Sequence, residues 1–259
     1  RDCEIDLEVF TMGYNLNQKG KHWDQKNYAG EAAMAIKTAE DWGYKVHHLT
    51  LDKDDVDNYG KMWLANTHYL WADHNRQAPR YLLCKAAAEA GCKVVLSGDS
   101  GDELFSGYIH HNRRFEKGYC ESLTRNFSNQ RWFPYKAFGD DHLNNSLFSD
   151  LLCTSEQNIL ATDQTAGMFG MESRIPLLTQ SFAKYVLSIM GSVKFRQTKK
   201  YAKGTNKFLM REVMKDYLPE HVQTRKEKVG WSSPWDNNHP QLTHRWKVQA
   251  LDFLRTQIK

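Results

Sequence analysis

Hydrophobic and polar positions change their spacing several times along the first hundred residues. A short apolar run, LEVFTMGY at residues 7–14, precedes a polar, turn-rich stretch at residues 15–26. We therefore expect a strand followed by a loop. From Ala29, small and apolar residues recur at the spacing of one helix face as far as Gly43, which suits a helix C-terminus. A second strand is predicted over residues 44–51.

The same alternation continues further along. We expect a polar linker after residue 51, a helix that Pro79 opens and Gly91 closes, and a strand over residues 93–96. Strands that alternate with helices are typical of crossover units in a parallel sheet. The uninterrupted apolar run at residues 94–96 predicts a strand that is covered on both faces.

The second half of the chain has a different pattern. One helical stripe, which Gly191 is expected to cap, consists of Phe182, Tyr185, Val186, Ile189 and Met190. Residues 206–218 predict another helix, which Pro219 stops. We expect a single α/β domain over residues 1–259, with a parallel-sheet core in residues 1–115 and a mainly helical part in residues 116–259.

Composition narrows the class of protein. With 41% hydrophobic and 12% aromatic residues, the 259-residue chain can bury a sizeable core. Its apolar stretches are too short to cross a bilayer and its first residues are charged, so we expect a soluble, cytoplasmic protein without a membrane partner. Five cysteines without a C-x-x-C pair indicate reduced thiols. A net charge of +4 suits a polyphosphate ligand without requiring nucleic acid.

The candidate chemistry lies at SGDSGDE, residues 97–103, directly after a predicted strand and before a predicted helix. Ligands of open α/β sheets bind beyond the carboxyl ends of the strands, where glycines let backbone N–H groups approach a nucleotide. Carboxylates beside a polyphosphate act mainly through Mg²⁺, which makes Asp102 the metal candidate. From spacing alone, Ser97, Asp99 and Asp102 could equally cap and complement the following helix.

A longer string decides between these readings. Residues 97–108, SGDSGDELFSGY, resemble the hallmark string of the asparagine synthetase family, with Ser100 in place of a glycine; we call them the signature segment. Three further stretches resemble the same family in the same order: PRYLL at residues 79–83, MESRIPLL at residues 171–178, and residues 207–230. Together the matches span nearly the whole chain.

The resemblance implies a fold and an activity. The expected core is an adenine nucleotide alpha hydrolase-like, N-type ATP pyrophosphatase sheet. The expected reaction is amide formation driven by ATP: AMP is transferred to a carboxylate, most commonly that of aspartate, and attack by ammonia gives amide, AMP and pyrophosphate. ATP and Mg²⁺ would be required, and the partners would be the carboxylate substrate and ammonia.

The resemblance also assigns roles to residues. It implies catalytic roles for Asp99, in orienting the reacting groups or handling a proton, and for Lys226, which falls on the family's pyrophosphate-binding lysine. A lysine there would stabilise the charge of departing pyrophosphate. The other implied roles are ATP binding by Met12, Gly13, Ser97, Gly98 and Gly101, metal binding by Asp102, and substrate binding by Asp163, Glu172 and Arg174. A structural ion pair is an equally good reading of Glu172 and Arg174.

The two pairs of adjacent histidines are candidate metal ligands. However, adjacent residues of a strand point to opposite faces, and neither His47-His48 nor His110-His111 has flanking ligands at zinc spacing. We do not expect these histidines to bind metal.

Two parts of the family pattern are missing from the sequence. The Ser-Gly-Gly-x-Asp-Ser loop that cradles pyrophosphate in the family should lie upstream of Phe10, and the glutamine-hydrolysing domain is absent. We therefore expect an upstream segment or a partner chain to supply this loop. Departures at residues 71–77 and at Thr179 leave the substrate preference open.

Three alternatives stay open at this point. The same scaffold resembles enzymes that close β-lactam rings or cyclise peptides with an internal amine. Without its pyrophosphate loop, the chain could also be a degenerate nucleotide-binding subunit that has no catalysis. A nucleic-acid-binding module is disfavoured because no base-reading motif accompanies the basic stretches.

Overall fold

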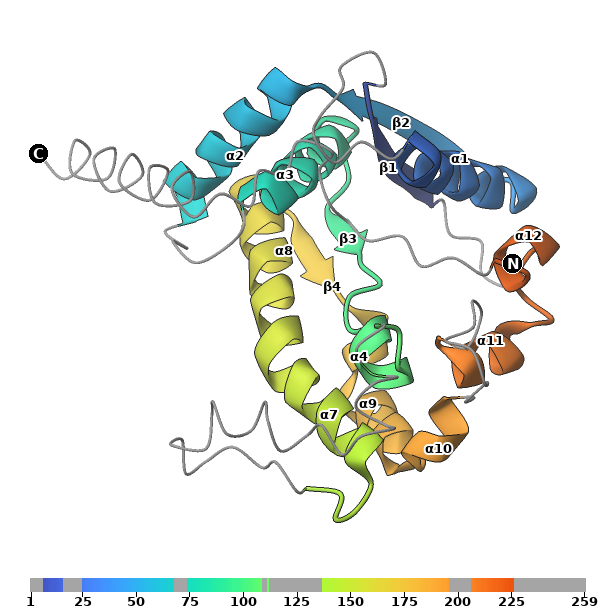
Figure 1. Cartoon of the computed structure of the whole chain (residues 1–259). Coiled ribbons are helices and arrows are strands. Elements are labelled where there is room, and N and C mark those ends of the chain that lie inside the picture. Colours follow the sequence, from blue (N-terminus) through green and yellow to red (C-terminus); the bar gives the residue numbers. More distant parts are fainter. Residues whose placement is uncertain are drawn as a thin grey trace, which may run out of the picture. The chain divides into compact units, whose positions relative to one another are not determined.

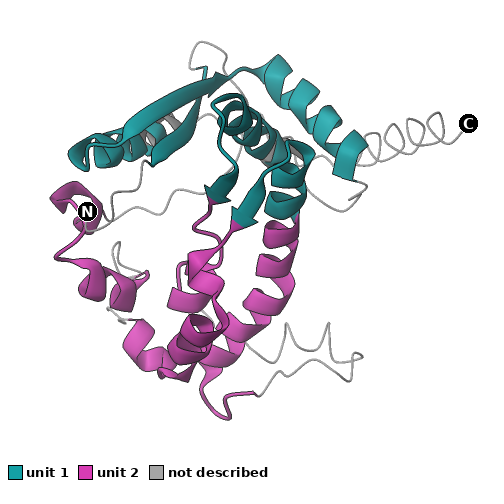
Figure 2. Ribbon diagram, turned by 180° about the vertical axis from the view of Figure 1, so that it is seen from behind, with its two compact units in different colours: residues 1–95, 161–173, 229–259 teal, residues 96–160, 174–228 magenta. Residues whose placement is uncertain are grey.

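The computed structural model describes residues 7–15, 25–67, 74–108, 111, 137–195 and 206–225 (Figure 1). The chain forms two compact units that interleave along the sequence (Figure 2). Unit 1 contains residues 1–95, 161–173 and 229–259, and unit 2 contains residues 96–160 and 174–228. The division of one domain at residues 115 and 116 stays a prediction.

Unit 1 contains a parallel strand pair joined by a helix. Strands β1 (Glu8–Tyr14) and β2 (Lys45–Leu51) pair in parallel from Glu8↔Lys45 to Tyr14↔Leu51, and α1 (Gln25–Asp41) connects them. Parallel neighbours need such a crossover. Gly43, just after α1, has the left-handed φ of 75° that glycine tolerates best. The predicted strand, helix and strand are confirmed in α/β form.

The polar linker predicted after residue 51 is wrong, because α2 (Lys53–Thr67) occupies most of it. Asp52 caps this helix, since its Oδ1 accepts the Asp55 N–H at 2.8 Å. Val56 and Trp63 are buried on one face of the helix. These few apolar residues at helical spacing indicated a helix, but the polar composition of the stretch led to the prediction of a linker.

Helix α3 (His74–Glu89) packs in the same unit, and it corrects a second prediction. It begins five residues before Pro79, which lies inside the helix rather than opening it. Residues of α3 enter three apolar clusters, with Tyr81 against Trp63, Ala78 against Tyr14, and Cys84 against Met171. The described cysteines, Cys84, Cys92 and Cys153, are free thiols as expected, and burial raises the pKa of Cys84 to about 11.

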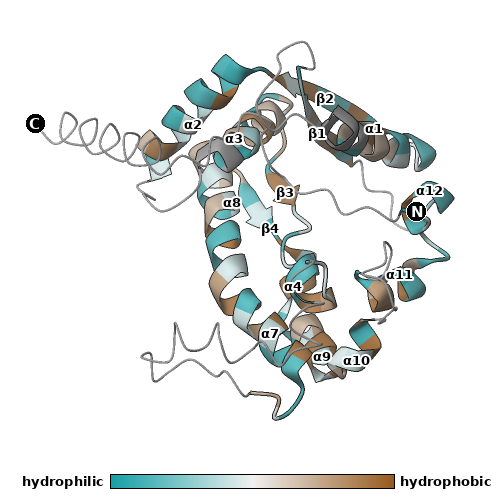
Figure 3. Cartoon of the chain, in the orientation of Figure 1, coloured by the Kyte–Doolittle hydropathy of each residue, from teal (hydrophilic) through white to brown (hydrophobic). Residues whose placement is uncertain are grey.

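Strands β3 (Val94–Leu96) and β4 (Glu172–Arg174) form a second pair. The bonds Glu172 N–H to Lys93 O and Ser97 N–H to Arg174 O advance in the same direction along both strands, as in a parallel pair. The prediction that β3 is covered on both faces is wrong. Val94 is 41% and Leu96 61% exposed, although the strand is hydrophobic (Figure 3).

This exposure has a geometric reason. Side chains alternate across a strand, so Val94 and Leu96 share one face of β3, and only Val95, on the other face, packs in the apolar cluster of Cys84 and Met171. A run of three apolar residues therefore does not distinguish a strand buried on both faces from one buried on a single face.

Among its described residues, unit 2 is mainly helical. Its elements after β3 are α4 (Gly101–Phe105), α7 (His142–Asp150), a π-helical turn η1 (Leu151–Ser155), the start of α8 (Glu156–Met168), a 3₁₀ turn η2 (Pro176–Leu178), α9 (Gln180–Ser188), α10 (Gly191–Lys194), α11 (Phe208–Met214) and α12 (Glu220–Gln223). Leu104 and Phe105 of α4 pack against Val186 and Leu187 of α9. The core of unit 2 therefore holds α4 in place.

The helix boundaries near Gly191 differ from the prediction. Helix α9 ends at Ser188, and Gly191 begins α10 instead of capping α9. A Cβ on Gly191 would lie 2.6 Å from Asp141 Oδ1, so close packing explains this glycine. Tyr185 and Met190 of the predicted apolar stripe are exposed. The helix predicted over residues 206–218 is shorter than expected, because α11 ends at Met214 and not at Pro219, which is the N-cap of α12.

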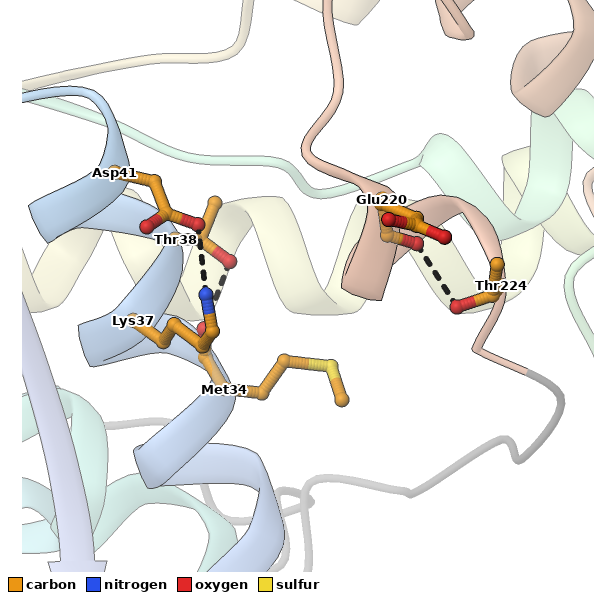
Figure 4. A network of polar contacts seen from close by, with 6 residues as sticks. All are labelled: Met34, Lys37, Thr38, Asp41, Glu220 and Thr224. Carbon is orange, nitrogen blue, oxygen red and sulfur yellow. Dashed lines mark hydrogen bonds and ion pairs between the residues drawn. The ribbon is translucent and has the colours of Figure 1, made fainter.

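Local hydrogen bonds support the helix surfaces within each unit (Figure 4). On α1, Lys37 pairs with Asp41 at 3.0 Å, and Thr38 Oγ1 donates to Met34 O at 2.7 Å. On α12, Thr224 Oγ1 donates to Glu220 O at 2.9 Å. Within the described residues, no helix has the length and apolarity that crossing a membrane requires.

Candidate functional site

The signature segment runs from the end of β3 through α4, so the predicted position between a strand and a helix is confirmed (Figure 1). Ser97 N–H donates to Arg174 O at 3.0 Å and fixes the start of the loop to the end of β4. Ser97 Oγ donates to Asp99 Oδ2 at 2.6 Å and accepts the Asp99 N–H at 3.1 Å. These two bonds hold the half-buried Asp99 carboxylate on the turn.

Both ends of α4 have a left-handed backbone on residues other than glycine. Ser100, the N-cap, has a φ of 69°, and Ser106, the C-cap, has a φ of 61°. Such conformations cost on the order of 1 kcal/mol for residues with a Cβ. The buried Ser100 Oγ donates to Ser155 Oγ at 3.0 Å, which offsets part of that cost. This bond explains how serine is accommodated where the family string has glycine.

Asp102, the metal candidate, is paired with a lysine from α11. Lys207 Nζ lies 3.2 Å from Asp102 Oδ1, and the side chains are 30% and 19% exposed, respectively. Gly107 makes room for this pair, because a Cβ there would lie 1.6 Å from Asp102 Oδ1 and 2.7 Å from Lys207 Cε. The glycine that precedes Tyr108 in the signature segment is therefore required by the Asp102–Lys207 pair.

The next acid of the segment faces the interior. Glu103 is 2% exposed, and Tyr108 Oη donates to its Oε1 at 2.7 Å. Burial raises the pKa of the Glu103 carboxyl, the bond from Tyr108 opposes that rise, and the carboxylates of Asp102 and Asp150 add to it. Burial and the neighbouring Glu103 raise the pKa of the Tyr108 phenol.

A buried histidine connects Tyr108 to α7. His111 is fully buried, and its Nδ1 accepts the Tyr108 backbone N–H at 3.3 Å. Because Nδ1 acts as an acceptor, the ring proton lies on Nε2, which donates to Asp150 Oδ2 at 2.9 Å. Glu103, Tyr108, His111 and Asp150 thus form a buried polar network behind the signature segment. Sequence reasoning missed the role of His111 because its partner Asp150 lies 39 positions further along the chain.

Met12 and Gly13, which are predicted to bind ATP, lie on β1 in unit 1. Met12 packs against an apolar cluster that contains Tyr14 and Leu51. Gly13 lies close to its neighbours, since a Cβ there would be 3.2 Å from His48 Nε2 and 3.5 Å from the Cβ of Ala32. Packing between β1, β2 and α1 is a sufficient reason for this glycine, and nucleotide contact by either residue stays a prediction.

The remaining predicted residues are distributed over other elements. Asp163 is exposed on α8, and Glu172 and Arg174 are exposed at the two ends of β4, where residues two apart lie on the same side of the strand. Lys226 lies outside the described residues. The structure therefore brings Ser97, Gly98, Asp99, Gly101 and Asp102 together in one segment of unit 2.

The donor set near Asp102 fits a magnesium ion. Among the described residues there is no group of three or more histidine, cysteine, aspartate or glutamate side chains able to hold a metal. Mg²⁺ commonly takes only one or two carboxylates and completes its shell with phosphate oxygens and water. A single carboxylate against a glycine-lined segment suits that mode, and a closed protein cage is not needed.

Comparison with known proteins decides the family. The family described as asparagine synthase matches residues 4–251, which is nearly the whole chain. The chain belongs to the asparagine synthase family. The match contains β1 to β4 and the entire signature segment.

Relatives in the asparagine synthase family are distant. The asparagine synthetase (glutamine-hydrolyzing) of Zea mays is 25% identical over 242 residues, which cover 88% of this chain and 37% of that protein. A Methanocaldococcus jannaschii relative is 27% identical over 177 residues, which cover 58% of this chain and 29% of the relative. The chain thus spans less than two fifths of the length of these asparagine synthase relatives.

Proposed function

We propose that this chain is the synthetase part of an ATP-dependent carbon–nitrogen ligase of asparagine synthetase type. The observation that carries the proposal is the signature segment: a glycine-containing loop directly after a parallel strand, with Asp102 held beside Lys207. Its place within the family match supports the same reading.

The reaction proceeds in two balanced steps. An oxygen of the substrate carboxylate, that of aspartate in the commonest case, attacks the α-phosphorus of ATP, and the bond to the bridging oxygen breaks to release pyrophosphate. Ammonia then attacks the carboxyl carbon, the bond to AMP breaks, and the nitrogen loses a proton to a base. Adenylation converts a poor electrophile into a reactive one.

Residues of this chain have separate tasks in that reaction. Asp102 would hold Mg²⁺, which when bound would neutralise charge on the phosphates. Asp99, positioned by Ser97, orients the reacting groups or accepts a proton, and Lys226 stabilises the departing pyrophosphate. The remaining assignments are Met12, Gly13, Ser97, Gly98 and Gly101 for ATP and Asp163, Glu172 and Arg174 for the carboxylate substrate.

Two components come from outside these residues. We propose that an upstream segment or a partner chain supplies the loop that cradles pyrophosphate. The names of the curated relatives include glutamine hydrolysis, and we propose that free ammonia or a glutaminase partner serves as the nitrogen source for this chain.

The test is pyrophosphate release by the full-length gene product with MgATP, ammonia and a panel of carboxylates that includes aspartate. Asp102→Asn and Lys226→Ala should each lower turnover about 100-fold or more. Asp216→Asn, which changes an exposed acid of unit 2, should leave turnover unchanged. Normal turnover in both site variants would overturn the assignment. MgATP binding without pyrophosphate release under any condition would instead favour a non-catalytic nucleotide-binding subunit.

A further inference from the structure

Lys207 begins the family-like stretch at residues 207–230, but that resemblance assigned it no role in the site. It is the N-cap of α11, and its Nζ approaches Asp102 Oδ1 to 3.2 Å. The same Nζ lies 3.8 Å from the point where a Cβ on Gly101 would stand. The ammonium therefore occupies the space in front of the signature segment's metal carboxylate.

The backbone of Lys207 is held in an uncommon conformation. Its φ of 53° and ψ of 36° are left-handed, and among the described residues the only other non-glycine positions with positive φ are Ser100 and Ser106. Lys207 N–H donates to Ser106 O at 3.3 Å, which joins two of these strained positions directly. Such strain concentrates at functional sites, where the surrounding structure maintains it.

The surroundings of the pair are specialised as well. Gly107 has no Cβ where one would overlap both Asp102 and Lys207. An ordinary surface ion pair contributes little to stability and does not require a glycine and a strained lysine backbone. The geometry thus points to a cation that must stay beside Asp102, and not only to a link between α4 and α11.

We propose that Lys207 is the resident counter-cation of Asp102 and competes with the divalent metal for Oδ1. This inference rests on the proposed metal role of Asp102. Two cations cannot share one carboxylate oxygen at ion-pair distance without strong repulsion. Lys207 would therefore leave Oδ1 when a divalent metal is bound there, and its ammonium would then be free to contribute charge to the phosphates of the nucleotide.

This competition predicts effects of opposite sign in one variant. Lys207→Met should bind free Mn²⁺ about tenfold more tightly than the unaltered chain, because the competing charge is gone. The same variant should bind a non-hydrolysable MgATP analogue about tenfold more weakly, because the phosphates lose a cation. A merely structural ion pair would not produce a gain in one affinity and a loss in the other.

The experiment measures Mn²⁺ binding by electron paramagnetic resonance and analogue binding by calorimetry, on the full-length gene product. The variants are Lys207→Met, Lys207→Arg, Asp102→Asn and Lys215→Met. Lys207→Arg keeps the charge and should bind Mn²⁺ as the unaltered chain does. Lys215→Met changes an exposed lysine just after α11, and it should bind both Mn²⁺ and the MgATP analogue as the unaltered chain does. Denaturant unfolding verifies that each variant is folded.

The outcomes distinguish the metal role of Asp102 from the competing role of Lys207. Tighter Mn²⁺ binding by Lys207→Met, together with loss of Mn²⁺ binding by Asp102→Asn, supports the proposal. If Asp102→Asn loses Mn²⁺ but Lys207→Met binds it as the unaltered chain does, the role of Lys207 is overturned and the metal assignment stands. If Asp102→Asn binds Mn²⁺ normally, the metal assignment of the proposed function fails, and the role of Lys207 fails with it.

Discussion

Tyr108 Oη donates a 2.7 Å hydrogen bond to Oε1 of Glu103, and both residues belong to the signature segment. Glu103 is buried, whereas the neighbouring Asp102 pairs with Lys207 at the half-buried front of α4. Two adjacent acids of one motif therefore have different environments. Glu103 secures the helix from inside, whereas Asp102 faces Lys207.

Removing the hydroxyl group of Tyr108 should lower the stability of the fold without changing the fold itself. Tyr108→Phe leaves the buried Glu103 carboxyl short of a donor, and this should lower the free energy of unfolding by about 1–3 kcal/mol. Urea unfolding measures the difference. Tyr185→Phe, at a tyrosine that is 67% exposed, serves as the matched control and should shift the unfolding free energy by less than about 0.5 kcal/mol. Equal effects of the two substitutions would contradict a structural role of the Tyr108 hydroxyl.

The buried Glu103 should also give the protein a particular pH dependence. Its pKa is raised above the ordinary value of 4.5, chiefly by burial, so the folded state binds more protons than the unfolded state just above that pH. The contribution of Glu103 to stability is therefore fully present below about 4.5 and is lost as the pH rises through the folded pKa.

Glu103→Gln removes this titration and keeps an acceptor for Tyr108. We expect the unfolding free energy of the unaltered chain, minus that of the variant, to decline as the pH rises from 4.5. Unfolding curves over a series of pH values test this, with the exposed Glu220→Gln as control. A difference that is constant with pH would show that Glu103 ionises in the fold as it does in the unfolded chain.

Lys194 should produce a dependence of the opposite sign in the alkaline range. Burial lowers its pKa to about 8 although Asp141 opposes the shift, and its Nζ donates to Asn144 Oδ1 at 2.7 Å. Between about 8 and the ordinary value of 10.5 the unfolded state binds more protons, so stability rises with pH. The gain should be on the order of 3 kcal/mol, and it should be absent in Lys194→Met. Parallel curves for both proteins would contradict it.

Ser100 offers a test of strain at the start of α4. Ser100→Gly relieves a φ of 69° and loses the hydrogen bond to Ser155, so the two effects of about 1 kcal/mol each should nearly cancel. Ser100→Ala loses the bond and keeps the strain, and it should therefore be less stable than Ser100→Gly by about 1 kcal/mol. Thermal unfolding compares the two variants. An alanine variant as stable as the glycine variant would argue against strain at this position.

The sequence predicted those parts of the structure that local pattern determines. The strand ending at Tyr14, the helix before Gly43 and the loop after Leu96 follow from short-range periodicity and glycine placement. The same approach missed α2, because its buried face is carried by few apolar residues, such as Trp63, within a polar stretch. It also placed Val94 in the core, because three apolar residues do not reveal which face of a strand is covered.

The candidate site was predictable to a similar extent. The motif indicated Asp102 and its neighbours, since those residues are adjacent in sequence. The partners that complete their environment, Lys207 and Asp150, are contributed by α11 and α7. No local pattern places Lys207 beside Asp102 or Asp150 beside His111, because tertiary packing creates those contacts.

The central claim is that this chain belongs to an enzyme that adenylates a carboxylate before forming an amide. Aspartate labelled with ¹⁸O in its side-chain carboxylate, incubated with the full-length gene product, MgATP and ammonia, tests that claim most directly. Mass spectrometry should find one ¹⁸O atom in the AMP, because the attacking carboxylate oxygen stays on phosphorus when the amide forms. Turnover that yields unlabelled AMP, or ADP with the label in inorganic phosphate, would contradict it.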